Sequence, residues 1–143
     1  MKLLIVDDEK LTREGILKSL PLEKLGIHHT FMADDGVHGL EIALKEKPDL
    51  ILTDVRMPRM SGVEMAEEIL KALPNAIILF MSAYSDKEYL KAAIKLKAVS
   101  YVDKPLDMNE LTEALAEGIH QYRSMYTSLN ARWMHEDNLR SQL

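Results

Sequence analysis

Short apolar runs, each followed directly by charged residues, recur along this chain. The clearest three are residues 3–6, which lead into Asp7 and Asp8, residues 50–53, which lead into Asp54, and residues 99–103, which lead into Lys104. Runs of this length are typical of strands that are buried on both faces of a parallel sheet. Because the carboxyl ends of such strands share one edge of the sheet, where ligands bind, we expect these charged side chains to converge. Crowded carboxylates repel one another, so the sequence predicts a divalent metal ion between them.

Helix-like segments separate the apolar runs. Two further runs, at residues 27–32 and 76–81, complete a set of five strands, and the first of them is polar enough to suit an edge of the sheet. Helices are predicted over residues 10–20 and 36–46, and again after each of the last three strands. Strands that alternate with helices favour a doubly wound α/β sheet, although spacing alone leaves the strand order open.

Capping residues mark the starts of the last three helices. Ser61, Ser85 and Asp107 each precede a glutamate by three positions, which is typical of a helix N-terminus. Helical spacing then predicts which faces are buried: Val63, Ala66, Leu70 and Leu73 after Ser61, and Tyr89, Ala92, Ala93 and Leu96 after Ser85.

Composition narrows the possible functions. The 143 residues suggest one domain with an appendage, and the formal net charge of −5 argues against nonspecific binding to nucleic acid. The absence of cysteine excludes a disulfide framework and thiol catalysis. No apolar stretch approaches the ~18 residues of a membrane span, and the first strand leaves no room for a signal peptide. We therefore expect a soluble, cytoplasmic protein that does not bind a membrane.

Four separated motifs resemble the receiver domain of two-component response regulators. They are Val-Asp-Asp-Glu at 6–9, Thr-Asp-Val-Arg-Met-Pro-Arg-Met-Ser-Gly at 53–62, Met-Ser-Ala-Tyr at 81–84 and Tyr-Val-Asp-Lys-Pro at 101–105. The resemblance covers residues 1–120 and implies a five-stranded, flavodoxin-like parallel sheet in the strand order 2-1-3-4-5. It also implies that Asp54 accepts a phosphoryl group from a sensor histidine kinase, with Mg²⁺ as the cofactor.

The resemblance gives each charged residue of the predicted site a role. It implies that Asp8 and Asp54 bind Mg²⁺ directly, that the backbone carbonyl of Arg56 adds a third oxygen, and that Asp7 holds a metal-bound water. The ammonium group of Lys104 would pair with the phosphoryl group as a compact charge. The residues alone leave two alternatives: Asp7 and Asp8 could cap the first helix, and Lys104 could extend into solvent.

Three further features would belong to the switch of such a domain. By resemblance, the Ser82 hydroxyl binds a phosphoryl oxygen, and Tyr101 moves inward when Ser82 shifts. Tyr101 fits an ordinary strand aromatic equally well. The resemblance also makes the Lys104–Pro105 bond cis, whereas sequence statistics alone favour trans.

Arg56 and Tyr84 occupy positions that should flank the phosphoryl group. Neither carries a carboxylate or an amide that could align an attacking water, so we predict slow autodephosphorylation rather than an enzyme with turnover. An aspartate-nucleophile phosphatase would need a second aspartate where Arg56 stands. A nucleotide- or flavin-binding module would need a Gly/Ser/Thr-rich loop after the first strand. Arg56 could instead form a salt bridge with a nearby acid.

The last helix has no clear stop. From Asp107 to the final residue there is no proline and only one glycine, Gly118. Apolar residues recur in steps of four and three, which is typical of a coiled-coil seam: Leu115, Ile119, Tyr122, Tyr126, Leu129 and Trp133. Residues 121–143 are therefore predicted to be a helical extension or linker that pairs with a second copy, contacts a following domain, or packs back on the same domain.

Two segments, at residues 7–16 and 84–94, look like receivers of AraC-type transcriptional regulators. In that case an output domain outside this sequence would bind DNA and control transcription, and this fragment would not bind DNA directly. A stand-alone receiver or a phosphorelay protein is the alternative.

Overall fold

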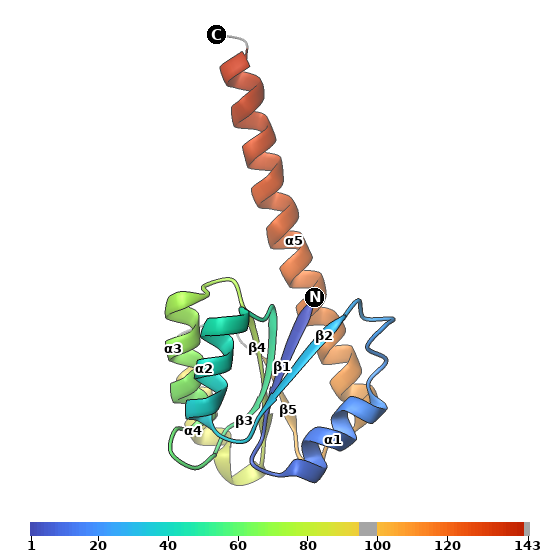
Figure 1. The fold of residues 1–143 in the computed structure, drawn as a ribbon, viewed down its shortest axis with the longest axis vertical. Helices are drawn as coiled ribbons and strands as arrows, with labels where there is room; N and C mark the ends of the chain where they lie inside the picture. Colours follow the sequence, from blue (N-terminus) through green and yellow to red (C-terminus); the bar gives the residue numbers. More distant parts are fainter. Residues whose placement is uncertain (95–99, 142–143) are drawn as a thin grey trace.

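The structure is a computed structural model that describes the backbone of residues 1–94 and 100–141, and the side chains of residues 1–91, 100–125 and 127. Its apolar runs form a five-stranded parallel sheet (Figure 1) in the order β2-β1-β3-β4-β5, which confirms the expected order. The strands are β1 (Lys2–Val6), β2 (His29–Ala33), β3 (Leu50–Asp54), β4 (Ile77–Ser82) and β5 (Ser100–Asp103). Because β1, β3 and β4 lie in the middle, they are the strands with the most continuous apolar sequence.

Helices cover both faces of this sheet. In chain order they are α1 (Lys10–Ser19), α2 (Gly36–Glu46), α3 (Gly62–Ala72), the short 3₁₀ helix η1 (Tyr84–Asp86), α4 (Lys87–Ile94) and α5 (Met108–Ser141). Figure 1 shows α2 and α3 on one side of the sheet and α1 and α5 on the other. This is the doubly wound arrangement that the alternation of strands and helices predicted.

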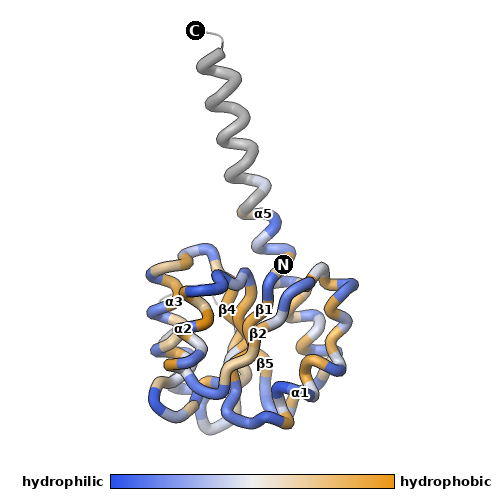
Figure 2. Tube along the Cα trace, viewed as in Figure 1, coloured by the Kyte–Doolittle hydropathy of each residue, from blue (hydrophilic) through white to orange (hydrophobic). Residues whose placement is uncertain are grey.

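The sheet separates two apolar cores, since successive residues of a strand point to opposite faces. Leu4, Val6 and Ile51 face α2 and α3, in a core that also contains Leu90 of α4. On the other face, Leu3 and Ile5 belong to a core with Ile16 of α1 and Leu111, Leu115 and Ile119 of α5. The tube coloured by hydropathy shows the same pattern, with apolar strands inside and polar helix faces outside (Figure 2). Burying one apolar side chain of this size stabilises the folded state by about 1.5–3 kcal/mol relative to leaving it exposed.

The start of the second strand differs from the sequence prediction. Ile27 is buried as an apolar residue should be, but its backbone N–H donates to the carbonyl of Leu22, within a turn. The strand begins only at His29, which pairs with Lys2 of β1. The expectation that this strand lies at the edge of the sheet is confirmed.

Ser85 does not cap a helix, contrary to the prediction. It lies inside η1, which continues directly into α4, and the N–H of Asp86 donates to the carbonyl of Ala83. The buried residues of this segment are Asp86 and Leu90, whereas Tyr89 is 43% exposed. The side chains of the other residues predicted for this face, Ala92, Ala93 and Leu96, lie outside the described ones.

The other two predicted caps are present. The Ser61 hydroxyl accepts the N–H of Glu64 at 3.1 Å, and a carboxylate oxygen of Asp107 accepts the N–H groups of Asn109 and Glu110. Val63, Ala66 and Leu70 are buried on α3, as expected.

Helix α5 leaves the sheet without a break. A Cβ on Gly118 would lie 2.9 Å from Cγ2 of Ile77, so this glycine serves close packing on β4 rather than a kink. One turn later the Tyr122 hydroxyl donates to Asp49 at 2.8 Å. Beyond that contact α5 extends away from the sheet and does not pack back on it (Figure 1). The side chains of Tyr126, Leu129 and Trp133, the distal part of the predicted seam, lie outside the described ones.

None of the helices in the described part of the chain combines the length and the apolar character that crossing a membrane requires.

Candidate functional site

Three carboxylates meet at the carboxyl edge of the sheet. Asp7 and Asp8 follow β1, Asp54 ends β3, and these two strands are hydrogen-bonded neighbours. One carboxylate oxygen from each of the three residues lies within 4.8 Å of the others. Asp7 is fully buried and Asp54 is 8% exposed, whereas Asp8 is open to solvent. We call these three residues the acidic cluster.

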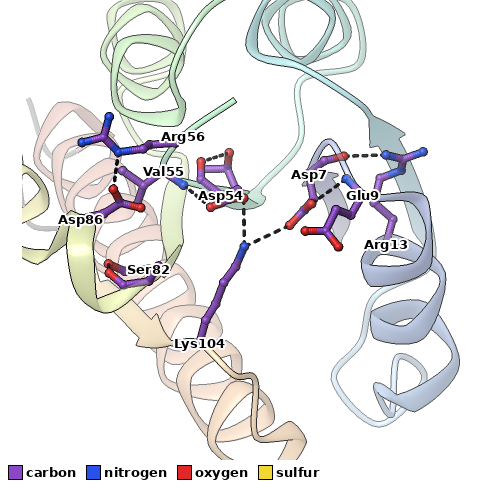
Figure 3. A network of polar contacts seen from close by, with 11 residues as sticks. Asp7, Glu9, Arg13, Asp54, Val55, Arg56, Ser82, Asp86 and Lys104 are labelled. Carbon is purple, nitrogen blue, oxygen red and sulfur yellow. Dashed lines mark hydrogen bonds and ion pairs between the residues drawn. The ribbon is translucent and has the colours of Figure 1, made fainter. Parts of the chain in front are cut away.

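Lys104 brings a positive charge to the acidic cluster from the end of β5. Its Nζ donates to Oδ2 of Asp54 at 2.9 Å and lies 3.7 Å from Oδ2 of Asp7 (Figure 3). The backbone N–H of Lys104 donates to the carbonyl of Ser82, which holds the residue there. The Lys104–Pro105 bond is cis, as the resemblance implied. Burial opposes the charge, but the hydrogen bond and the charge of Asp54 outweigh it and raise the pKa of Lys104. Lys104 is therefore a cation inside the site and not a solvent-exposed loop lysine.

Asp7 is the carboxylate of the acidic cluster whose negative charge is least stabilised by its surroundings. Its Oδ1 accepts the N–H of Glu9 at 2.8 Å, but its buried Oδ2 accepts no hydrogen bond from any described residue. Burial raises the pKa of Asp7, and this outweighs the lowering effect of the Glu9 bond and of Lys104. A buried carboxylate oxygen without a donor is the kind of atom that a bound cation satisfies.

The acidic cluster suits a small divalent cation. Its donors are all carboxylate oxygens, which Mg²⁺ prefers, and the exposure of Asp8 leaves room for the waters that Mg²⁺ retains. The alternative that Asp7 and Asp8 cap α1 is not what the structure shows, because Glu9 occupies the N-cap position and no side chain caps this helix.

Backbone contacts fix Asp54 itself. Its Oδ1 accepts the N–H of Val55 at 2.8 Å, and its backbone carbonyl accepts the Thr53 hydroxyl at 2.9 Å. Gly62, the first residue of α3, packs so closely that a Cβ would lie 1.9 Å from the Asp54 carbonyl oxygen. The loop between β3 and α3 can therefore close over the strand end only with glycine at position 62.

The remaining predicted residues lie around this centre. Ser82 is fully buried at the end of β4, and its hydroxyl donates to the carbonyl of Ala83 at 3.1 Å. Tyr101, on the edge strand β5, is 39% exposed, which is an outward position. Tyr84 is 86% exposed on η1, so its ring is open to solvent.

Comparison with known proteins agrees with the motifs. The family model of the response regulator receiver domain matches residues 3–116. This chain belongs to that family. The resemblance inferred from the sequence is thereby confirmed, and the protein contains a receiver domain of two-component signalling.

Relatives of this receiver are longer proteins. A response regulatory protein of Staphylococcus epidermidis is 39% identical over 114 residues, covering 80% of this chain and 45% of that protein. Transcriptional regulatory protein HptR of Staphylococcus aureus is 36% identical over 110 residues, covering 77% of this chain and 43% of HptR. The match thus spans less than half the length of these relatives.

Solved structures show the same fold. A two-component transcriptional regulator AraC from Clostridium phytofermentans is 48% identical with a TM-score of 0.81, and the match covers 86% of this chain and 98% of that one. The receiver domain of AraT, a response regulator from Geobacillus stearothermophilus, is 31% identical with a TM-score of 0.82, over 87% and 97% of the two chains.

Two contacts of this receiver site were not predicted as such from the sequence. The Arg13 guanidinium donates to the backbone carbonyl of Asp7, which fixes the acidic loop after β1. Arg56 pairs with Asp86 of η1, a buried acid 30 positions further along the chain. A salt bridge of Arg56 was anticipated, but the identity of its partner was not. The only signal for Asp86 was an acid within a short polar segment, which is indistinguishable from a solvated helix start.

Proposed function

We propose that this receiver accepts a phosphoryl group on Asp54 from a sensor histidine kinase and that Mg²⁺ assists the transfer. The observation that carries the proposal is the acidic cluster around Asp54 with the Lys104 ammonium 2.9 Å from the Asp54 carboxylate. A carboxylate is a competent nucleophile toward phosphorus. Phosphoryl transfer needs mainly in-line positioning and neutralised oxygens.

The reaction forms one bond and breaks one. An oxygen of Asp54 attacks phosphorus, the bond between phosphorus and the donor's imidazole nitrogen breaks, and that nitrogen keeps the electron pair and later takes a proton from water. Lys104 and the Ser82 hydroxyl supply donors to the phosphoryl oxygens from β5 and β4. Asp8, Asp54 and the backbone carbonyl of Arg56 would hold Mg²⁺, with Asp7 binding one of its waters. Mg²⁺ supplies neutralisation of charge on the transferred group.

The same residues support a two-state switch. In the structure the Ser82 hydroxyl donates to the carbonyl of Ala83, and Tyr101 is partly exposed. A phosphoryl group on Asp54 would offer the Ser82 hydroxyl a stronger, charged acceptor. Movement of Ser82 would open space for Tyr101 to turn inward, which shifts the population toward a second packing of β4 and β5.

The output of the switch is proposed to be transcriptional. Relatives that this chain matches over less than half their length include a transcriptional regulatory protein. DNA would be bound by an output domain outside this sequence, and α5 would connect the two parts and pair with a second copy through its apolar seam. The receiver would act in the cytoplasm, where histidine kinases present their phosphorylated histidine. Hydrolysis of the phosphoryl group would be slow, because neither Arg56 nor Tyr84 can align water.

Labelling by a small phosphodonor tests the central claim. The full chain is incubated with acetyl phosphate and MgCl₂, and the intact mass is measured. We expect one added phosphoryl group, which disappears with Asp54→Asn and with a chelator and persists in Asp34→Asn. Asp34 is an exposed aspartate outside the acidic cluster, with 65% of its side chain accessible. Labelling of the Asp54→Asn variant, or labelling without a divalent cation at the same rate, would contradict the proposal.

The secondary claims have separate measurements. Loss of the label after removal of acetyl phosphate gives the lifetime, and complete loss within seconds would contradict slow hydrolysis. Size-exclusion chromatography of the full chain, before and after labelling, reports whether a second copy binds. A monomer under both conditions would refute pairing through α5.

A further inference from the structure

Arg56 lies close to the acidic cluster in the sequence, but its charged side chain points away from the cluster. It follows Asp54 by two positions, yet in Figure 3 its guanidinium extends away from Asp54 and meets Asp86. Nε of Arg56 donates to Oδ1 of Asp86. Lys104 approaches Asp54 separately, from the end of β5. Arg13 donates to the backbone carbonyl of Asp7. Of these three cations, Arg56 is the one whose charged group pairs with an acid outside the acidic cluster.

The two partners of this ion pair are unequally fixed. The Asp86 side chain is 6% exposed, inside η1, whereas the Arg56 side chain is 70% exposed. The Arg56 guanidinium also lies 5.9 Å from the centre of the Tyr89 ring, and the Tyr89 hydroxyl is 3.5 Å from the Ser61 hydroxyl. Asp86 is therefore the anchor, and the arginine is the group that would move if the anchor lost its charge.

A released Arg56 would be attracted to the acidic cluster. The three carboxylates there outnumber the two cations that contact Asp7 or Asp54, Lys104 and Arg13, so the net local charge is negative. A guanidinium matches carboxylates with two parallel hydrogen bonds and sheds its hydration readily. Inserted between Asp8 and Asp54, it would neutralise the oxygens that a divalent cation needs. The arginine of the chain would then compete with Mg²⁺.

We propose that Asp86 is a positioning residue that retains the Arg56 side chain away from the acidic cluster and so keeps the cluster open to Mg²⁺. This inference rests on the proposed function, because it takes the cluster as the place where Mg²⁺ binds. It goes further in assigning to a buried acid on η1, outside the cluster, control over the affinity of the site. Asp86 acts through Arg56 and touches neither the metal nor the phosphoryl group.

The test is calorimetric titration of the metal-free full chain with MgCl₂. For Asp86→Asn we expect the Kd for Mg²⁺ to rise by about tenfold, which equals about 1.4 kcal/mol. That size lies between the interaction of two unit charges in water and at a protein surface. Adding Arg56→Met to Asp86→Asn removes the competitor, and the Kd should return to within about threefold of the original value, or about 0.7 kcal/mol. Restored affinity in the double variant is the signature that a merely structural role of Asp86 would not give.

Two more variants complete the set. Glu68→Gln is the matched control, because Glu68 pairs with Lys71 on the exposed surface of α3, and its Kd should equal that of the original chain. Asp86→Ser is made alongside Asp86→Asn, since it removes the same charge with a smaller side chain. Circular dichroism verifies the fold of each variant.

The outcomes separate this inference from the proposed function. If the original chain binds no Mg²⁺, both fail. If it binds Mg²⁺ and Asp86→Asn binds equally well, or if the double variant stays as weak as Asp86→Asn, only the role of Asp86 is overturned. Failure of both Asp86 variants to fold would also overturn it, because a positioning residue is not required for folding.

Discussion

Replacing Gly62 by alanine tests how tightly the loop after β3 holds Asp54, the proposed phosphoacceptor. The added Cβ would lie 1.9 Å from the carbonyl oxygen of Asp54 and 3.1 Å from Oγ1 of Thr53. Ordinary contacts of this kind begin near 3.4 Å. Either α3 or the end of β3 must therefore move by more than an ångström. The obstructing atom belongs to the backbone, so no side-chain rotation can relieve the clash.

The cost can be estimated from this geometry. Overpacking in a well-packed region typically costs about 1–3 kcal/mol. We expect the upper end, about 3 kcal/mol, because the N–H of Gly62 also donates to the carbonyl of Val55 at 2.8 Å and ties the loop in place. For a domain of this size, such a loss lowers Tm by roughly 6–12 °C. Asp54 would shift with its carbonyl, so labelling by acetyl phosphate should also slow.

Gly15→Ala is the matched control. Nothing lies within 4 Å of a Cβ at Gly15, in the middle of α1, and alanine is favoured over glycine in a helix by about 1 kcal/mol. This variant should gain stability and label normally. Thermal unfolding followed by circular dichroism, together with the labelling time course, measures both effects. Should Gly62→Ala unfold at the same temperature as the original chain, or should both variants lose stability alike, the account of the loop is wrong.

Three further changes have defined outcomes. Lys104→Gln removes the ammonium that donates to Asp54 at 2.9 Å, so labelling by acetyl phosphate should slow by about a hundredfold, and an unchanged time course would exclude a role in transfer. Tyr122→Phe removes the hydroxyl that donates to Asp49, so urea unfolding should show a loss of about 1 kcal/mol, and no loss would mean that the bond is not formed in solution. Asp7→Asn tests the burial that raises the pKa of Asp7. Because the folded, metal-free chain favours the protonated carboxyl, the stability of the original chain should decline as the pH rises from the ordinary pKa of 3.8 through the raised pKa of Asp7. The variant should lack this decline in Tm measured against pH with a chelator present, and equal slopes for both proteins would contradict the assignment.

The central strands and the site at their ends could be predicted because one physical requirement governs both. A strand buried on two faces must be apolar throughout, so a charge directly after it marks the edge of the sheet. Asp7 and Asp54 meet this criterion. Lys104 was also predicted from the end of a short run, but its strand, β5, lies at the edge of the sheet and is mostly exposed, contrary to the expectation of a strand buried on both faces. The register of β1 against β3 then brings Asp7 and Asp54 together, although 47 positions separate them.

The edge of the sheet and the segment after β4 were harder to predict, because their hydrogen bonds do not follow from apolar pattern. Ile27 reads as the start of a strand since it is buried, yet its N–H is used by a turn. Ser85 reads as a cap since glutamate follows three positions later, yet the chain there forms η1 and buries Asp86 instead. In both cases the residue type predicted correctly that the position is apolar or polar, but it did not predict the backbone conformation that the chain adopts there.

Asp86 shows why part of a charged site escapes sequence analysis altogether. Its burial is tolerable only because Arg56 reaches it from another loop, and such a pair leaves no periodic trace in the sequence. In the proposal made above, the pair acts on the acidic cluster indirectly, because a released Arg56 would compete with a metal ion for the same oxygens. A metal site is more available to an added cation when a neighbouring arginine that could fill it is paired with another acid. We therefore expect the acid that pairs with such an arginine to help set the affinity of the site, and it is found by following each nearby charge to its partner.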